Sequence, residues 1–256
     1  MRPSIFNPRT RPEPEPAESL QSTFLPTLGL LVLSLLVFEL TPFDVWFQDF
    51  FFDFQTGRWW VDASAPGLRL LFYVGPKALL ILFGLGVIIL LISPERVRCA
   101  MGAGGRRKEL GVVLAVLAIG PALISGLKAT TNVFCPAEMT RYGGDVPYAR
   151  VFDCYPEGQK PARRGRCFPA GHASGGFALF ALAGLGRTRR GQRLGFAVGL
   201  FAGGWMGGYQ ILKGAHYLSH TLVTALLIWI LFLLCNNLID RLSTRFRHRK
   251  NEQKFI

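Results

Sequence analysis

Long apolar runs alternate with short polar or basic connections along most of the chain. Each run has about 20 residues, enough for a helix to cross a hydrocarbon core of ~30 Å. The pattern predicts an all-α fold, a polytopic membrane helix bundle with six transmembrane helices near residues 23–42, 68–93, 109–128, 170–186, 193–213 and 217–239. The first run follows too many prolines and glutamates to be an ordinary cleaved signal peptide, so we expect it to be retained.

Composition supports a membrane protein. Half of the 256 residues are hydrophobic and 18% are charged, which is too apolar for a soluble domain of this length. The net charge of +13 is compatible with nucleic-acid binding, but the Lys and Arg residues lie mainly between the apolar runs. We therefore expect a membrane-embedded protein with no nucleic-acid partner. The sequence does not determine its oligomeric state.

Three segments make up the predicted organisation. Residues 1–20 contain a Pro-Glu-Pro-Glu-Pro run and predict a disordered cytoplasmic tail. Residues 21–240 form the six-helix domain, and residues 241–256 form a basic cytoplasmic tail. Within the domain, the aromatic-rich residues 43–60 suit the membrane interface, where they either meet a lipid or only anchor the fold.

Orientation follows from the basic connections, because Lys and Arg are retained on the cytoplasmic side. Clusters of these residues lie within 96–108, 187–193 and 241–250. Both termini are then cytoplasmic, and the outward loops are 43–67, 129–169 and 214–216, facing the periplasm of a bacterial inner membrane. The loop 129–169 is itself basic. Either some of its charges hold an anion, or a long folded loop obeys the charge rule weakly.

Residues 167–172 read Cys-Phe-Pro-Ala-Gly-His and suggest a phosphate site. Pro169 fits the first position of a helix, Gly171 lets an anion approach the backbone, and His172 can donate a proton. Lys128 and Lys213 end the third and fifth apolar runs. Ionisable groups gathered at one end of membrane helices usually mark a substrate site.

Cleavage of a phosphate ester needs cations or amides around the phosphoryl oxygens, a nucleophile, and an acid for the leaving oxygen. The spacing of the candidates resembles the type 2 phosphatidic acid phosphatases, whose pattern is K-x6-R-P, P-S-G-H and S-R-x5-H-x3-D. The corresponding segments are Lys128-x6-Cys135-Pro136, Pro169-Ala170-Gly171-His172 and Tyr209-Gln210-x5-His216-x3-His220. The resemblance covers residues 109–239.

This resemblance implies a hydrolase that works through a phosphohistidine and needs neither a metal nor another cofactor. It makes His216 the nucleophile and His172 the acid that protonates the leaving group and later activates water. Lys128 then binds phosphoryl oxygens, together with the backbone amides of Ala170 and Gly171.

Several positions depart from the family pattern. Cys135 and Gln210 replace arginines, Ala170 replaces a serine, and His220 replaces the aspartate that orients the nucleophile. Loss of two arginines weakens the grip on phosphate.

Other residues can compensate for these losses. Lys213 lies one helical turn after Gln210 and can supply a cation, and Arg166 or Arg141 can supply another. His220 can accept a hydrogen bond from His216 and fix its tautomer. Alternatively, an acid of the large loop takes the aspartate role: Glu138, Asp145 or Asp153.

Three cysteines lie in the predicted outward loop, where the compartment is oxidising. If the first two motifs line one site, Cys135 and Cys167 are brought close, so we expect a disulfide between them. A Cys154–Cys167 bridge is the second choice, and three free thiols the remaining one. Residues 141–148 form either a lid over the site or a simple turn.

Together these features predict a membrane lipid phosphatase acting at the outer leaflet. The family suggests phosphatidate, phosphatidylglycerol phosphate, undecaprenyl diphosphate or the phosphate groups of lipid A as substrate. Two alternatives remain open: a phosphotransferase that uses the same intermediate, and a non-catalytic protein that binds or transports anionic lipid.

Overall fold

The computed structural model describes residues 19–153, 155, 158 and 160–252, with side chains up to residue 243. The tail predicted for residues 1–20 lies almost wholly outside this range, and Cys154 lies outside it too. Near the C-terminus, the last helix continues to Glu252, so most of the predicted basic tail is helical.

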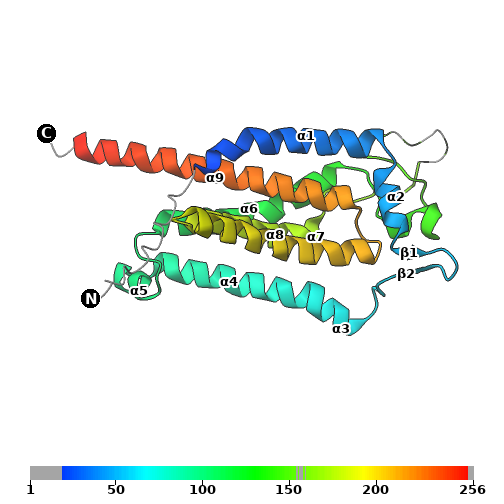
Figure 1. Cartoon of the computed structure of the whole chain (residues 1–256), viewed down its shortest axis with the longest axis horizontal. Coiled ribbons are helices and arrows are strands. Elements are labelled where there is room, and N and C mark those ends of the chain that lie inside the picture. Colours follow the sequence, from blue (N-terminus) through cyan, green and yellow to red (C-terminus); the bar gives the residue numbers. More distant parts are fainter. Residues whose placement is uncertain (1–18, 154, 156–157, 159, 253–256) are drawn as a thin grey trace, which may run out of the picture.

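All six predicted apolar runs are helical and lie side by side (Figure 1). The helices that correspond to these runs are α1 (Phe24–Leu40), α4 (Gly75–Ile92), α6 (Arg107–Thr130), α7 (Gly171–Phe177), α8 (Arg189–Leu212) and α9 (Leu218–Glu252). The remaining helices are α2 (Phe43–Asp49), α3 (Pro66–Arg69) and α5 (Glu95–Ala100), with 3-10 turns at Leu20–Thr23, Pro136–Glu138 and Thr140–Tyr142. A π-helical turn, Leu70–Val74, joins α3 to α4, and α7 continues as a 3-10 helix, Ala178–Leu185.

Four of the described helical segments are long and apolar enough to cross a membrane, where the sequence predicts six. They are Leu20–Leu40, Pro66–Ile92, Arg107–Thr130 and Leu218–Ser243. The segment Gly171–Leu185 is apolar but has only 15 residues, and a helix of that length is roughly 25 Å long. Helix α8 begins with charged residues and is rich in glycine, which lowers its hydropathy.

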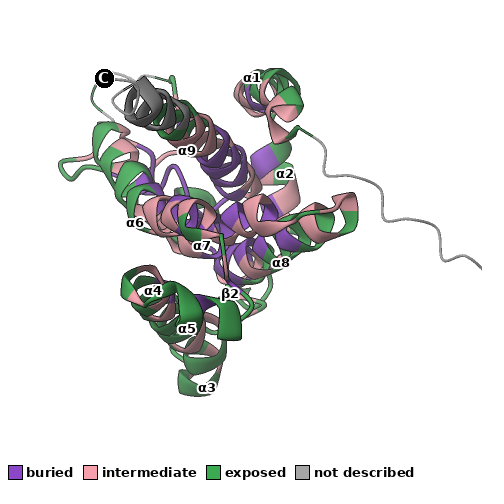
Figure 2. Ribbon diagram, turned by 90° about the vertical axis from the view of Figure 1, so that its left-hand side faces the viewer, coloured by how far each residue is buried: buried purple, intermediate pink, exposed green. Residues whose placement is uncertain are grey.

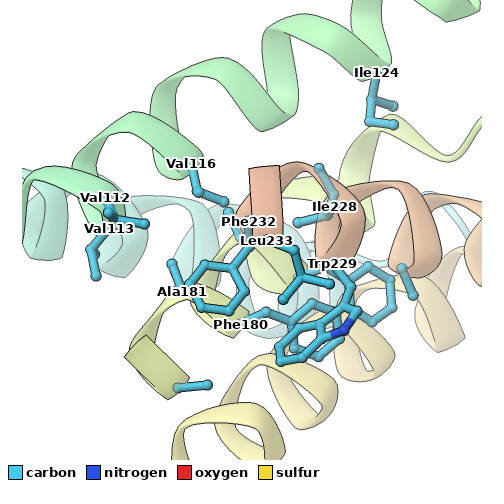
Figure 3. Close-up of a cluster of buried hydrophobic side chains, with 14 of the residues drawn as sticks. Val112, Val113, Val116, Ile124, Phe180, Ala181, Ile228, Trp229, Phe232 and Leu233 are labelled. Carbon is cyan, nitrogen blue, oxygen red and sulfur yellow. The ribbon is translucent and has the colours of Figure 1, made fainter. Parts of the chain in front are cut away.

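The centre of the bundle is α7 with its 3-10 extension, packed against α6, α8 and α9 (Figure 2). A glycine at every fourth position of α8 allows the close approach, since a Cβ at Gly203 would lie 2.1 Å from the Phe177 ring. On the other side, side chains of α6 and α9 fill the core around Phe180 (Figure 3). Helix α1 packs on α9, and α4 packs on α6 and α7.

The aromatic segment 43–60 is not purely helical, which modifies the all-α prediction. It contains α2 and a short antiparallel hairpin, β1 (Phe52–Asp53) and β2 (Arg58–Trp59). The turn forms because the Asp53 carboxylate accepts hydrogen bonds from the backbone N–H groups of Gln55 and Thr56. Hairpin, α2 and α3 lie at one end of the bundle, whereas α5 and the starts of α6 and α8 lie at the other (Figure 1).

Candidate active site

The three motif segments meet at the end of the bundle that carries α2 and the hairpin. Lys128 lies in the last turn of α6, His172 in the first turn of α7, and His216 in the turn between α8 and α9. The rings of His172 and His216 are 5.8 Å apart between centroids. A Cβ placed on Gly171 would lie 4.0 Å from Lys128 Nζ, so this backbone position and the ammonium group face each other.

A disulfide joins Cys135 to Cys167, as the sequence predicts. It links the chain after α6 to the chain before α7. The Cys167 N–H donates to the Val133 carbonyl oxygen at 2.8 Å, and the Thr131 hydroxyl donates to the Phe168 carbonyl oxygen at 2.6 Å. These bonds hold the first two motifs together.

His216 is held in a tight turn and is 1% exposed. The backbone N–H groups of Ala215 and His216 both donate to the Gln210 carbonyl oxygen, and Gly214 adopts a φ of +72°. Nδ1 of the ring lies 3.3 Å from Cys167 Sγ, while Nε2 has no hydrogen-bond partner in the described part of the chain. Burial, aided by the nearby basic groups, lowers the pKa of His216 well below its usual value, so the imidazole is neutral at pH 7.

His220 does not orient His216 in the way expected from the sequence. The two rings are 5.8 Å apart, edge to face, and no hydrogen bond joins them. Nδ1 of His220 is buried without a partner among the described residues. The side chain packs instead against the rings of Phe168 and Tyr217.

The loop acids proposed as substitutes for the missing aspartate are engaged elsewhere. Glu138 and Asp145 both form ion pairs with Arg163, and Asp153 accepts a hydrogen bond from the Arg150 backbone N–H. The turn at residues 141–148 packs through Tyr142 and Val146 onto the hairpin region. These groups stabilise the loop between α6 and α7.

The Ala170 amide is not free to bind a phosphate. Its N–H donates to the His220 carbonyl oxygen at 3.1 Å, and its own carbonyl oxygen accepts a hydrogen bond from the Thr224 hydroxyl at 3.3 Å. Ala170 therefore connects α7 to α9, and only Gly171 of the two proposed amide positions lies beside Lys128.

Gln210 and Lys213 both lie near the His216 turn. Gln210 is 1% exposed, and neither its amide nitrogen nor its amide oxygen has a partner within the described residues. Lys213 places its ammonium group 4.7 Å from the centre of the Tyr209 ring.

The two arginines proposed to compensate for the missing ones, Arg141 and Arg166, differ in whether their charge is already paired. Arg141 makes two hydrogen bonds to the Asp49 carboxylate, at 2.8 and 2.7 Å, so its charge is already neutralised. Arg166 is exposed next to the disulfide. Of these two arginines, Arg166 is the one whose charge is available to an incoming anion.

A cavity of about 540 Å³ opens beside His172, between α4, α6 and α7. Lys128 and Lys77 line it, Tyr73 places its ring 4.9 Å from the His172 ring, and the rest of the wall is mainly apolar. The charges of Lys128, Lys213 and Lys77 all act on His172. Lys77 was not predicted as a site residue from the sequence, although an ionisable residue inside an apolar run is itself a signal of function.

The aromatic segment supports the His216 turn from outside. Gln48 of α2 donates a hydrogen bond to the Ile211 carbonyl oxygen at 2.9 Å, and the Trp59 ring lies against Gly214. Asp44 accepts hydrogen bonds from the backbone N–H and hydroxyl of Ser219, in the first turn of α9. The segment therefore does more than anchor the chain at an interface.

Among the described residues, one group of metal-binding side chains lies close together: Cys135, Cys167 and His216, with ligand atoms within 4.8 Å. The two sulfur atoms are bonded to each other, so they lack the thiolate character that a metal ligand needs. In its disulfide form this group does not fit a metal ion.

The fold and the site thus describe a helical membrane protein in which His172, Lys128 and Lys77 line an apolar cavity and the buried His216 ring lies 5.8 Å from that of His172. The model of the PAP2 superfamily matches residues 109–243, more than half of the chain. The chain belongs to this superfamily, whose members are generally phosphatases acting on phosphate esters. No curated protein and no solved structure matches it.

Proposed function

We propose that the protein is a metal-independent lipid phosphatase that uses a phosphohistidine intermediate on His216. The observation that carries this proposal is the pair of histidine rings 5.8 Å apart beside Lys128, each with a ring nitrogen that has no partner among the described residues. Buried polar atoms without partners are costly, so their presence at one place indicates a ligand that satisfies them.

In the first step, the lone pair of His216 Nε2 attacks phosphorus and the bond from phosphorus to the lipid oxygen breaks. Protonated His172 gives its proton to that oxygen. The incoming phosphate favours the protonated form of His172, because it brings negative charge to a ring surrounded by lysines.

In the second step, neutral His172 takes a proton from water as the water oxygen attacks phosphorus. The bond from phosphorus to Nε2 breaks, its electron pair returns to the ring, and inorganic phosphate leaves. Lys128, Lys77 and Lys213 neutralise the phosphoryl oxygens in both steps, and the Gln210 amide can donate a further hydrogen bond.

The apolar cavity favours a lipid over a soluble ester, because its wall suits an acyl or isoprenoid chain once the phosphate lies between Lys128 and His172. Phosphatidate, phosphatidylglycerol phosphate, undecaprenyl diphosphate and lipid A are the candidates. The six-span arrangement, with the site facing the periplasm of a bacterial inner membrane and both termini in the cytoplasm, is supported by the basic segments at the opposite end of the bundle (Figure 1).

The test is phosphate release by the purified protein in detergent, across a panel of lipid monophosphates and diphosphates. We expect release that survives a chelator, vanishes in His216→Ala and persists in His248→Ala, a matched histidine variant in the last turns of α9. Loss of activity with chelator would contradict metal independence.

The same panel separates the two alternatives. If the substrate carries a labelled phosphate group, transfer of that phosphate to an added acceptor lipid instead of to water would identify a phosphotransferase. Binding of lipid phosphates without release or transfer by the folded protein would identify a non-catalytic lipid-binding protein.

A further inference from the structure

The catalytic mechanism leaves one question about His216, namely which group holds its ring in the productive tautomer. In the family pattern an aspartate four residues later has this role, and here that position is His220. Since no hydrogen bond joins the two rings in the described structure, the orienting group lies elsewhere.

Cys167 presents two acceptors to the His216 ring, its backbone carbonyl and its Sγ, and the sulfur lies 3.3 Å from Nδ1. Because Cys167 is bonded to Cys135, its sulfur carries no hydrogen and can only accept. The proton of this contact must therefore lie on Nδ1, which leaves the lone pair on Nε2. That is the tautomer that attack on phosphorus requires.

The contact is well fixed. Cys167 is fully buried and His216 is 1% exposed, so water does not compete for either atom. The Cys167 N–H is hydrogen-bonded to Val133, and the disulfide joins its side chain to the end of the first motif. Sulfur, ring and turn thus have little freedom to separate.

We propose that Cys167 is a positioning residue for His216, with the disulfide sulfur at Nδ1 taking the place of the family carboxylate. The inference rests on the proposed function and deepens it, because it explains how this chain keeps a usable nucleophile without the aspartate. A sulfur acceptor is neutral and weak, so it fixes the tautomer but adds no negative charge to stabilise the phosphohistidine.

The test compares variants that all lack the disulfide, so that loss of the cross-link is common to them. Cys135→Ala keeps the Cys167 sulfur, whereas Cys135→Ala with Cys167→Ala removes it, and Cys135→Ala with Cys167→Ser replaces it with a hydroxyl oxygen. We expect kcat of the alanine double variant to be roughly tenfold or more below that of Cys135→Ala, with a nearly unchanged KM, and the serine variant to recover part of it.

A second readout does not depend on turnover. Nitrogen-15 NMR of labelled histidine, with the His216 signals assigned from His216→Gln, reports which ring nitrogen carries the proton. We expect the Nδ1–H form in the wild type and a shift toward a tautomer mixture in the Cys135→Ala, Cys167→Ala protein. This readout separates failure of the positioning role from failure of the proposed phosphatase activity.

The pH profile supplies a third readout. In Cys135→Ala the free Cys167 thiol carries a hydrogen until it ionises, and only the thiolate is a strong acceptor for Nδ1–H. Activity of this variant should therefore gain a rising alkaline limb that the alanine and serine double variants lack. The other titratable groups that act on His216 are His220 of α9, Lys128 of α6 and His172 of α7, and all three are unchanged in the series.

Equal kcat values and unchanged tautomers across the three variants would overturn the proposal. The Cys167 carbonyl, which also faces the rings of His216 and His220, would then be the orienting group, because it is the same in every variant.

Discussion

The buried carboxyl of Asp44 gives a quantitative prediction about stability. Asp44 lies in α2, is 5% exposed, and accepts hydrogen bonds from the N–H and hydroxyl of Ser219 at the start of α9. Burial raises the pKa of Asp44 to about 6, against an ordinary 3.8, and the hydrogen bonds from Ser219 only partly oppose this rise. The perturbation that tests it is Asp44→Asn, which keeps the shape and removes the ionisation.

The sign of the effect follows from proton linkage. A carboxyl whose pKa is raised by folding stabilises the folded state when protonated, and this contribution is lost as pH rises from 3.8 through about 6. At about 1.36 kcal/mol per pKa unit, the shift corresponds to a loss of about 3 kcal/mol across that window. We expect the asparagine variant to lack this loss and to be at least as stable as the wild type at pH 8.

The assay is thermal or denaturant unfolding in detergent between pH 4 and pH 8, on the wild type, Asp44→Asn and Asp62→Asn. Asp62 is a suitable control because it is exposed, and hydrogen bonds from Ser64 lower its pKa rather than raise it. An Asp44→Asn protein that loses stability with rising pH as steeply as the wild type would refute this reasoning. The same loss in Asp62→Asn is expected.

Three further substitutions test the site. Gly214→Ala puts a side chain on a residue with a φ of +72° and places its Cβ 2.3 Å from the Trp59 ring. We therefore expect kcat to fall at least about tenfold, and Trp59→Leu to restore part of it by relieving the clash. Lys77→Met removes a cation from the cavity and should lower kcat/KM for lipid phosphates about tenfold or more, whereas Lys108→Met at the opposite end should not. Gln210→Leu removes a buried amide without partners in the described residues, so phosphate release should fall while thermal stability stays equal or rises. Unchanged release in any of the three, measured with the lipid panel, would remove that residue from the site.

Much of the fold could be predicted from the sequence because apolar runs of about 20 residues have few alternatives to helix. The hairpin at 52–59 could not, since two-residue strands have no pattern of their own and form where aromatic side chains pack on the His216 turn. The central position of α7 was also missed. Its signal was present, however, in the glycines spaced by four along α8, which permit close packing of helices.

The candidate site, like the fold, could be predicted only in part from the sequence. Motif spacing was enough to predict that Lys128, His172 and His216 lie together, and that Cys135 and Cys167 are joined. It could not show that the disulfide sulfur, and not His220, faces Nδ1 of His216, because that depends on how two turns approach each other in three dimensions.

Capture of the intermediate tests the proposed chemistry most directly. The protein would be mixed with a lipid phosphate labelled with phosphorus-32, quenched within a turnover in alkali, and examined for label bound to protein through an acid-labile, alkali-stable bond. We predict label on the wild type and on His248→Ala, and none on His216→Ala. Turnover without any bound label, or label that persists in His216→Ala, would contradict a phosphohistidine at His216.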